Sequence, residues 1–418
     1  MTKTTSNTIM IRVIAFWGLI FALKIYLYIQ LIRFFERPLY KRLTIGLALT
    51  SMVCTGVGIY ALFARFADSM TQPSPAINYA IGLFISFAVL DLIMGAFFLL
   101  DDLWGGAKKV YYAASSSDGP NKGRRHFLKR AGMVIAALPF ASFLHGITIG
   151  KYNFTVHQED LVFDDLPEAF NGFKIAQISD VHAGSFDSPE AVRKGLELLQ
   201  AQGADLIVFT GDLVNVYAKE IEPYLDDFKK LQAPFGKYSI LGNHDYPLYG
   251  RHFDDEAHKE RNLAEVKAHH KTMNFRLLLN EHQKIEKDGA YICLAGVENW
   301  GRSHHFPKKG DLDKAFEGIQ EKDFTVLLSH DPTHWEEKIK SHSKQVHLTM
   351  SGHTHGFQLG VDLPFFKWSP IKYVYKHWAG LYQEAGQYLY VNRGFGFLGF
   401  AGRVGIFPEI TLFELKKP

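Results

Sequence analysis

The 418-residue chain contains only two cysteines, Cys54 and Cys293. Cys54 falls inside an apolar run and Cys293 inside a strand pattern, so the sequence excludes a disulfide scaffold and predicts a packing role for both. A closed structural zinc site is disfavoured as well, because such sites are usually built from several thiolates. Strong charge of one sign is also missing, since the formal net charge is +3 and the basic residues gather beside apolar segments. We therefore expect no nucleic-acid partner.

Hydrophobic residues make up 47% of the chain and are concentrated in its first third. A chain of this length usually forms more than one domain, so we predict an all-α transmembrane anchor over residues 1–150 and a second domain over residues 151–418. The first region contains four apolar stretches, at residues 10–32, 43–63, 76–100 and 131–149. Each is close to the roughly 20 residues that a helix needs to cross a bilayer.

Lysine and arginine are distributed unequally between these apolar stretches. The link between the second and third stretches carries only Arg65. The two other links are strongly basic, with Arg33, Arg37, Lys41 and Arg42 in one and Lys108, Lys109, Lys122, Arg124, Arg125, Lys129 and Arg130 in the other. Positively charged links stay in the cytoplasm, so the sequence predicts a multi-pass protein of the cytoplasmic (inner) membrane with its second domain on the outer, periplasmic side.

A twin-arginine-like motif precedes the fourth stretch, at residues 124–129 (Arg-Arg-His-Phe-Leu-Lys). It resembles the bacterial and archaeal export signal, with Gly123 where Ser or Thr is commoner. The alternative is an ordinary positively charged helix end. A clear cleavage site does not follow, so we expect the second domain to remain tethered.

Two charged residues, Lys24 and Asp91, lie within the first and third stretches at similar depth. Charges in mid-membrane are costly and normally paired, so we predict an ion pair between the two helices. The pair could be purely structural or could belong to a proton or substrate relay. A lone pair makes a poor pathway, which favours the structural interpretation.

Five short apolar runs in the second domain each end in side chains that can bind a metal. The runs are 173–178, 205–210, 238–241, 324–329 and 346–350, followed by Asp180, His182, Asp212, Asn243, His330, His353 and His355. Their alternation with amphipathic segments predicts an α/β or α+β domain. The carboxyl ends of neighbouring strands meet at one edge of a sheet, so we expect these side chains to converge there. A single His-rich loop is often a solvated turn, but five ligand-bearing strand ends favour a metal site.

These residues carry a resemblance to a known family. The series Asp180-x-His182, Gly211-Asp212, Gly242-Asn243-His244-Asp245, His330 and Gly352-His353-x-His355 resembles the calcineurin-like metallophosphoesterase superfamily. The resemblance implies a four-layer sandwich of two mixed sheets flanked by helices. Residues 388–394 and 408–412 further resemble a membrane-associated or exported bacterial branch, some members of which cleave the pyrophosphate of UDP-diacylglucosamine.

The resemblance also implies a site with two divalent metal ions. One ion is expected to bind Asp180, His182, Asp212 and His355, and the other Asp212, Asn243, His330 and His353, so that Asp212 bridges them. Carboxylate, imidazole and amide ligands suit Mn, Fe, Zn or similar ions. Two such ions can direct water at phosphorus and neutralise charge on phosphoryl oxygens. By the same resemblance, His244 protonates the leaving oxygen or stabilises the transition state, and Asp245 orients its imidazole.

The sequence departs from the family pattern beside the site. Phe357 stands where a glycine is common, directly before Gln358, so we expect these two residues to contact the substrate and Phe357 to narrow the pocket. Asn215 stands where an acid is frequent. Residues 357–378 combine aromatic and basic side chains, which suits either a packed loop over the sheet or an interfacial lid at the membrane surface. The charged segment 251–272 is predicted to be a solvated helix with His269 and His270 on its surface.

These features predict a membrane-anchored, dinuclear metal-dependent phosphohydrolase. Its substrate would be a phosphorylated small molecule or lipid with a phosphoester or pyrophosphate bond. The alternative is a non-catalytic membrane sensor or scaffold that binds a phosphorylated ligand through the metal site. A transporter is disfavoured, because the apolar stretches lack the glycine and proline pattern of broken helices.

Overall fold

The structure is a computed structural model that describes residues 3–67, 75–115, 122–249, 253, 255–384 and 386–418. The chain divides into two compact units. The helices up to His145 form the first unit, and Gly146–Pro418 forms the main part of the second.

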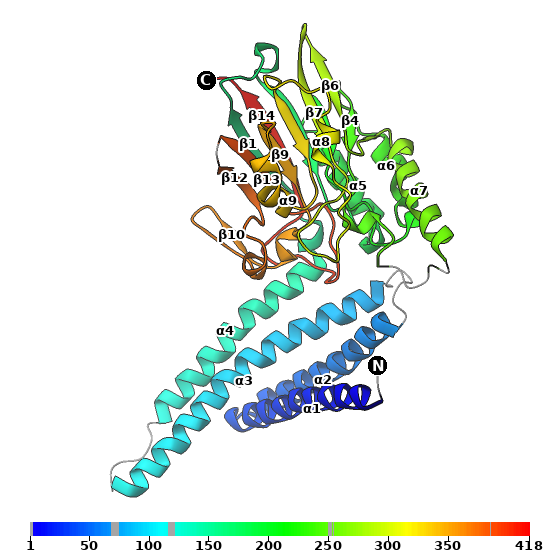
Figure 1. The fold of residues 1–418 in the computed structure, drawn as a ribbon. Helices are drawn as coiled ribbons and strands as arrows, with labels where there is room; N and C mark the ends of the chain where they lie inside the picture. Colours follow the sequence, from blue (N-terminus) through cyan, green and yellow to red (C-terminus); the bar gives the residue numbers. More distant parts are fainter. Residues whose placement is uncertain (1–2, 68–74, 116–121, 250–252, 254, 385) are drawn as a thin grey trace. The chain divides into compact units, whose positions relative to one another are not determined.

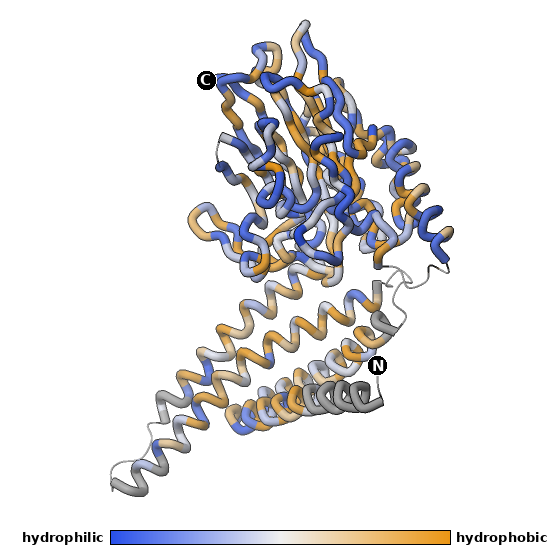
Figure 2. Tube along the Cα trace, viewed as in Figure 1, coloured by the Kyte–Doolittle hydropathy of each residue, from blue (hydrophilic) through white to orange (hydrophobic). Residues whose placement is uncertain are grey.

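Four long helices make up the first unit (Figures 1 and 2). They are α1 (Lys3–Phe34), α2 (Pro38–Ala67), α3 (Pro75–Ser115) and α4 (Lys122–Thr148). Each contains a segment long and apolar enough to cross a membrane, and these segments are Trp17–Phe34, Pro38–Phe63, Ala76–Lys108 and His126–Thr148. The prediction of four membrane-spanning helices is therefore confirmed. The side chains of Arg124 and Arg125 lie outside the described residues, so the export motif stays a prediction.

A buried polar cluster joins three of these helices. Lys24 on α1 forms the predicted ion pair with Asp91 on α3. The Lys24 ammonium also donates to Ser51 Oγ on α2 at 2.7 Å, and the Ser51 hydroxyl donates to Asp91 Oδ2 at 2.7 Å. The Tyr28 hydroxyl donates to the other Asp91 oxygen at 2.8 Å. Both carboxylate oxygens are thus used within the cluster, which supports the structural interpretation of the pair.

The second unit contains two six-stranded mixed sheets, in the orders β1-β14-β2-β3-β4-β5 and β12-β13-β9-β8-β7-β6, and a separate two-stranded hairpin, β10-β11 (Figure 1). The strands of the first sheet are β1 (Thr155–Val162), β2 (Phe173–Ile178), β3 (Leu206–Phe209), β4 (Lys237–Ser239), β5 (Arg276–Leu277) and β14 (Glu409–Lys416). Those of the second are β6 (Glu281–Lys287), β7 (Ala290–Gly296), β8 (Thr325–Leu328), β9 (Leu348–Ser351), β12 (Gly380–Glu384) and β13 (Gln387–Val391). The hairpin strands are β10 (Val361–Leu363) and β11 (Phe366–Trp368).

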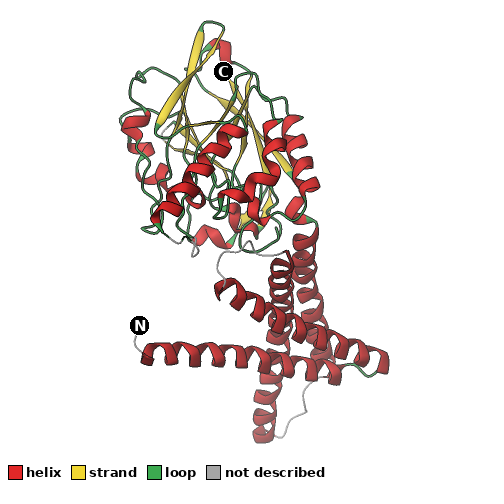
Figure 3. Cartoon of the chain, turned by 90° about the vertical axis from the view of Figure 1, so that its right-hand side faces the viewer, coloured by secondary structure: helices red, strands yellow, loops and turns green. Residues whose placement is uncertain are grey.

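Helices cover the outer faces of both sheets (Figure 3). They are α5 (Pro189–Gln200), α6 (Leu225–Lys229) and α7 (Glu256–Thr272) on the first sheet, with α8 (Leu312–Ala315) and α9 (Thr333–Glu337) on the second. Side chains of β3 alternate between two cores: Ile207 packs with the helices, whereas Val208 packs against the second sheet. The predicted four-layer α+β sandwich is confirmed.

The five predicted ligand-bearing strands exist, but they belong to two sheets and not to one. β2, β3 and β4 are parallel neighbours in the first sheet, and β8 and β9 are parallel neighbours in the second. The runs before the predicted ligands are short and mostly buried, and they include polar residues, as in Lys237-Tyr238-Ser239 of β4. Such runs do not show which strands pair with one another, so the sequence could not separate the two sheets.

The predicted solvated helix is α7, but His270 near its end is fully buried. Its ring stacks on Phe209, with 5.8 Å between ring centroids. Burial lowers the pKa of His270 to about 3, so the ring is neutral at physiological pH. The prediction of a surface position was wrong for His270, because the polar helix α7 still turns one face, with Asn262, Val266 and His270, towards the core.

Candidate metal centre

The backbone is unusual where the strands give way to the site. Asp180, His182, Asp212, His353 and His355 all have positive φ, between 47° and 74°. Non-glycine residues rarely adopt this left-handed conformation, because Cβ approaches the carbonyl oxygen at a cost of about 1–2 kcal/mol per residue. Backbone strain of this kind concentrates at functional sites, where the surrounding structure holds it in place. Five strained positions in three loops therefore mark this edge of the sandwich before any side chain is considered.

Two glycines allow these loops to approach each other closely. A Cβ atom on Gly242 would collide with the Asp212 carboxylate, and one on Gly352 would collide with the Asp180 carboxylate and the Ser179 hydroxyl. Only glycine leaves room for a carboxylate beside its backbone. The glycines of these motifs are thus explained by the positions of the acidic side chains.

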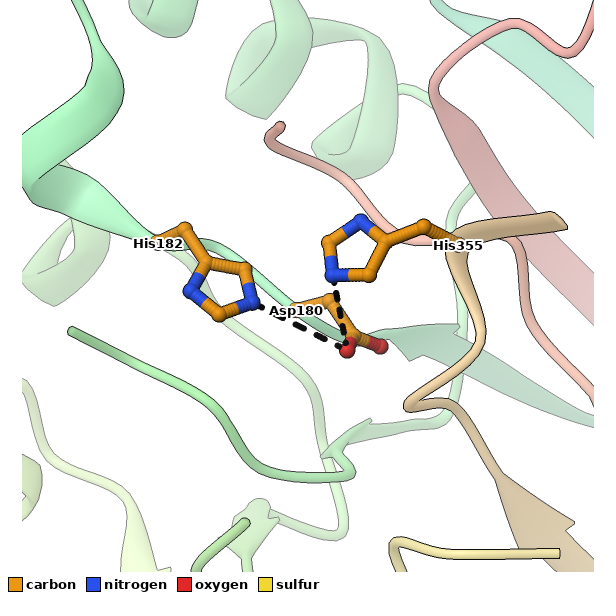
Figure 4. Close-up of side chains that lie close together, drawn as sticks. All are labelled: Asp180, His182 and His355. Atoms are coloured by element: carbon orange, nitrogen blue, oxygen red, sulfur yellow. Dashed lines mark ion pairs between the residues drawn. The ribbon is translucent and has the colours of Figure 1, made fainter. Parts of the chain in front are cut away.

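Asp180, His182 and His355 form a first group of metal-binding side chains (Figure 4). Their candidate ligand atoms all lie within 4.8 Å of one another. The Nε2 atoms of His355 and His182 lie 3.3 Å and 4.0 Å from Asp180 Oδ1. The backbone N–H of His353 donates to both Asp180 carboxylate oxygens at 3.0 Å, which fixes the orientation of that carboxylate.

Asp212, His330 and His353 form a second group. Nε2 of His330 lies 3.2 Å from Asp212 Oδ2, and Nε2 of His182 lies 3.4 Å from the same oxygen. One carboxylate oxygen therefore contacts a histidine from each group, as expected of a ligand shared by two ions. Asn243 Oδ1 lies 2.8 Å from Nδ1 of His353. The structure thus brings all seven predicted metal-ligand residues together.

The buried ring nitrogens of this site fit a bound cation. Both nitrogens of His182 and Nε2 of His330 and His355 make no hydrogen bond to the residues that the structure describes. Buried polar atoms are normally paired, so these atoms require a partner. In metal-binding histidines the ring nitrogen that does not bind the metal usually contacts an oxygen atom. Two rings show this feature here: Nδ1 of His330 contacts the Thr210 carbonyl oxygen at 2.7 Å, and Nε2 of His353 contacts the Tyr375 hydroxyl at 2.8 Å. The donor set suits two divalent ions.

The ionisation of these groups also matches metal binding. Burial lowers the pKa of the His182, His353 and His355 imidazoles, which favours the neutral form that binds metals. Burial alone would raise the pKa of Asp212, but the charges of His330 and His244 hold it well below its usual range. Burial lowers the pKa of His330, but the Asp212 carboxylate raises it by more, so that the pKa of His330 is about 10. A divalent ion would take the place of that proton beside Asp212.

Comparison with known proteins gives the same result. Residues 173–357 match the family "Calcineurin-like phosphoesterase", and residues 8–151 match the family "Probable Calcineurin-like phosphoesterase, transmembrane domain". The uncharacterized metallophosphoesterase YkuE of Bacillus subtilis is 32% identical over 260 residues, which are 60% of this chain and 82% of that protein. The chain belongs to the calcineurin-like metallophosphoesterase family.

Relatives with membrane segments occur in vertebrates. A transmembrane protein with a metallophosphoesterase domain from Danio rerio is 26% identical over 268 residues, which are 62% of this chain and 56% of that protein. Among solved structures, the phosphopantetheinyl hydrolase of Mycobacterium tuberculosis matches with 10% identity and a TM-score of 0.32, over 53% of this chain and 88% of that chain. This metallophosphoesterase is thus a multi-pass membrane protein with four transmembrane helices and two His/Asp groups consistent with the dinuclear site of its family.

His244 of this metallophosphoesterase lies beside the metal-binding groups, but its partner differs from the expected one. Nδ1 of His244 contacts the carbonyl oxygen of Asn215 at 2.8 Å. The Asp245 carboxylate instead accepts the backbone N–H groups of Gly242 at 2.8 Å, Asp212 at 2.9 Å and Leu213 at 2.8 Å. Asp245 therefore joins the loops after β3 and β4, and the prediction that it orients the imidazole was wrong. A backbone carbonyl has no side-chain signature, so the sequence could not reveal this contact.

Three further side chains that the sequence did not single out lie at the site. The Tyr249 ring stacks on His244 at 4.3 Å between centroids, and its hydroxyl accepts from Asn243 Nδ2 at 2.8 Å. Tyr375 contacts His353, and Oδ2 of the buried Asp331 lies 3.6 Å from the same ring. Tyr249 and Tyr375 come from loops with no spacing pattern, whereas the position of Asp331 directly after His330 was the one available signal.

Of the two residues predicted to contact substrate, only Phe357 remains a candidate. Gln358 is buried, and its amide donates to the Phe400 and Gly402 carbonyls at 2.7 and 3.1 Å and accepts from the Leu398 N–H at 2.6 Å. Its side chain therefore holds a loop, which corrects the prediction. Phe357 is 55% exposed and has a φ of 60°, a conformation that glycine would adopt without strain.

Proposed function

We propose that this metallophosphoesterase hydrolyses a phosphoester or pyrophosphate bond with two divalent metal ions, and that residues 1–150 anchor a catalytic domain formed by residues 151–418. The position of Asp212 carries this proposal, because its Oδ2 lies 3.4 Å from His182 and 3.2 Å from His330. A full ligand set together with His244 favours catalysis over a sensor or scaffold. Such a non-catalytic protein would not need a histidine beside its metals.

The residues of the site have distinct roles in this proposal. When bound, the two ions supply Lewis acidity that activates water and stabilises charge on the phosphoryl oxygens. Asn243 offers a neutral oxygen and so limits the negative charge that faces an anionic substrate. The proposed ligands are Asp180, His182, Asp212 and His355 for one ion and Asp212, Asn243, His330 and His353 for the other.

His244 is the proposed group that protonates the leaving oxygen or stabilises the transition state. Its Nδ1 is held by the Asn215 carbonyl, which leaves Nε2 for the substrate. Asp245 acts as a positioning residue, because it binds the backbone of Asp212 and of Gly242, which precedes Asn243. Proton transfer by a positioned histidine requires this kind of fixed ring.

Metal-dependent turnover tests the proposed chemistry. The purified full chain, stripped with a chelator, is expected to hydrolyse bis(p-nitrophenyl) phosphate only after Mn, Fe or Zn is added back. The measurement is release of p-nitrophenol, with metal content determined alongside. A protein that binds the metals and a phosphorylated ligand but releases no product would support the scaffold alternative and contradict hydrolysis.

A lipid-linked pyrophosphate is the proposed natural substrate class. Two observations support it: the chain carries its own membrane spans, and its sequence resembles a branch with members that cleave UDP-diacylglucosamine. Nucleotide-linked lipid pyrophosphates and simple lipid phosphates, presented in nanodiscs to the full chain, are the panel to compare. Faster turnover of water-soluble nucleotides than of every lipid would contradict this substrate class.

We also propose that the catalytic domain lies on the outer side of the cytoplasmic membrane and that residues 124–129 act as an export signal. The uneven distribution of basic residues between the spans supports this orientation. With Cys54 and Cys293 replaced by alanine, a cysteine added after Pro418 is expected to react with a membrane-impermeant maleimide in intact spheroplasts, whether the domain is exported folded or unfolded. Labelling only after the membrane is permeabilised would place the domain in the cytoplasm.

A further inference from the structure

The hairpin formed by β10 and β11 has its apolar face towards solvent. In its register Val361 pairs with Trp368, Asp362 with Lys367, and Leu363 with Phe366. Because side chains of a strand alternate between faces, the four apolar residues share one face and the two charged residues share the other. Val361, Leu363 and Phe366 are 37%, 46% and 52% exposed, and Phe365 in the turn is 86% exposed.

The charged face of the hairpin is tied to the rest of the domain through Asp362, while the Lys367 side chain is 37% exposed. Asp362 Oδ2 accepts from Arg393 at 2.7 Å, and the Arg393 side chain is only 4% exposed. A second carboxylate, that of the fully buried Glu409, contacts the same guanidinium at 2.6 Å. The Lys367 ammonium lies 3.7 Å from Asp362 and donates to the Ala379 carbonyl at 3.4 Å. Breaking a buried, hydrogen-bonded ion pair is costly, so the hairpin cannot simply turn over to bury its apolar face.

This arrangement is the reverse of the usual one, in which a sheet buries its apolar face and exposes its charged face. The inversion is maintained by a specific buried contact and is therefore a built feature of the fold. Contiguous exposed apolar surface of this kind marks a site of interaction with a partner or a membrane.

A second exposed apolar group follows the hairpin and leads into the metal centre. Tyr373 and Val374, at the end of the short helix η8 (Pro370–Tyr373), are 75% and 68% exposed. The next residue, Tyr375, contacts Nε2 of His353 at 2.8 Å. Before η8, the Ser369 hydroxyl donates to the Gly356 carbonyl at 2.8 Å. The exposed apolar segment is thus tied at both ends of η8 to the loop that carries His353 and His355.

We propose that the β10–β11 hairpin and the adjoining Tyr373–Val374 pair form a membrane-docking surface that inserts at the boundary between lipid headgroups and acyl chains. A lipid bilayer is the occupant that fits best, because the same chain carries four membrane spans and is therefore always at a membrane. The exposed Lys372 lies next to Tyr373 in η8, and a basic side chain beside exposed apolar ones suits anionic headgroups. The docked surface would hold the metal centre beside amphiphilic substrates, which deepens the proposed function and rests on it for the identity of the substrate.

Depth-dependent quenching tests the docking without relying on catalysis. The full chain, with Cys54→Ala and Cys293→Ala, receives a single labelled cysteine by Phe365→Cys and is reconstituted into nanodiscs of phosphatidylcholine and phosphatidylglycerol. Lipids with a nitroxide in the acyl chain are expected to quench the fluorescence of a label at this position strongly. The emission of the label should also shift to the blue when it enters the bilayer. The matched control is Asp288→Cys in the β6–β7 turn, where the native side chain is 77% exposed and lies at the ends of the strands away from the metal centre.

Several outcomes would overturn the proposal. Quenching at position 365 no stronger than at position 288 would show that the hairpin stays in water. Energy transfer between labelled chains without quenching by lipid would identify a second copy of the chain as the occupant. Quenching does not depend on turnover. If the protein proved inactive but the label were still quenched, the proposed function would be wrong and the docking would stand.

A variant links the docking to substrate access. Leu363→Ser combined with Phe366→Ser is expected to abolish quenching at a label introduced by Tyr373→Cys and to slow turnover of nanodisc-embedded lipid phosphates by at least about tenfold, while hydrolysis of bis(p-nitrophenyl) phosphate stays within about twofold. Equal losses on both substrates, with reduced metal content, would show a folding defect. In that event the Phe365→Cys quenching result decides the proposal alone.

Discussion

Replacing His244 with alanine is expected to lower turnover of bis(p-nitrophenyl) phosphate by about 10²–10⁴-fold while both metals remain bound. The side chain contacts no predicted ligand through its ring nitrogens, since Nδ1 is held by the Asn215 carbonyl. Its removal therefore takes away the group proposed to protonate the leaving oxygen or to stabilise the transition state, and leaves the His/Asp groups in place. Turnover is measured together with metal content, because only the combination identifies a catalytic role.

A matched control for this substitution is His342→Ala. His342 lies on the outer side of the second sheet, where Nε2 pairs with Asp313 at 3.2 Å. We expect normal turnover and metal content from this variant. An unchanged rate in His244→Ala would remove His244 from the mechanism, and a loss of metal equal to the loss of rate would make it a structural residue of the site.

Replacing Asp212 with asparagine is expected to empty both metal positions and to reduce turnover to background. The substitution keeps the size of the side chain but removes the negative charge that lies beside His182 and His330. Changes to residues that merely support metal ligands typically cost 10–100-fold in affinity, and a shared ligand should cost more. Titration of the stripped protein with metal ions, followed by calorimetry, measures the loss.

Asp205→Asn provides the control for this charge change. Asp205 precedes β3, at the other end of the strand from Asp212, and its carboxylate accepts the Lys174 N–H at 2.8 Å. Its substitution should leave metal binding intact. If Asp212→Asn bound two ions with normal affinity, the assignment of Asp212 as the shared ligand would be contradicted.

The seven residues that gather at the proposed metal centre could be predicted from the sequence because their information is local. A short apolar run followed by glycine and a carboxylate, amide or imidazole is visible in one dimension, as in Gly242-Asn243 and Gly352-His353. Parallel strands then bring their carboxyl ends to a common edge. The four membrane spans were predictable for a similar reason, since length and hydropathy alone define them.

Contacts made through the backbone or across loops could not be predicted. The imidazole of His244 is oriented by the backbone carbonyl of Asn215. Every residue type at position 215 has this carbonyl, so the sequence carries no sign of the contact. The stacking of Tyr249 on His244 depends on a loop path that no periodicity specifies. The inverted hairpin was hidden because its alternating pattern is compatible with either face inward, and only the contact of Asp362 with Arg393 decides between them.

Metal content of the purified full chain tests the central claim most directly. Elemental analysis of protein saturated with Mn, Fe or Zn and freed of excess metal should give two ions per chain, one at each His/Asp group, with Asp212 proposed as the ligand that both ions share. A stoichiometry of one ion or none per chain, in protein that is folded, would contradict a dinuclear centre.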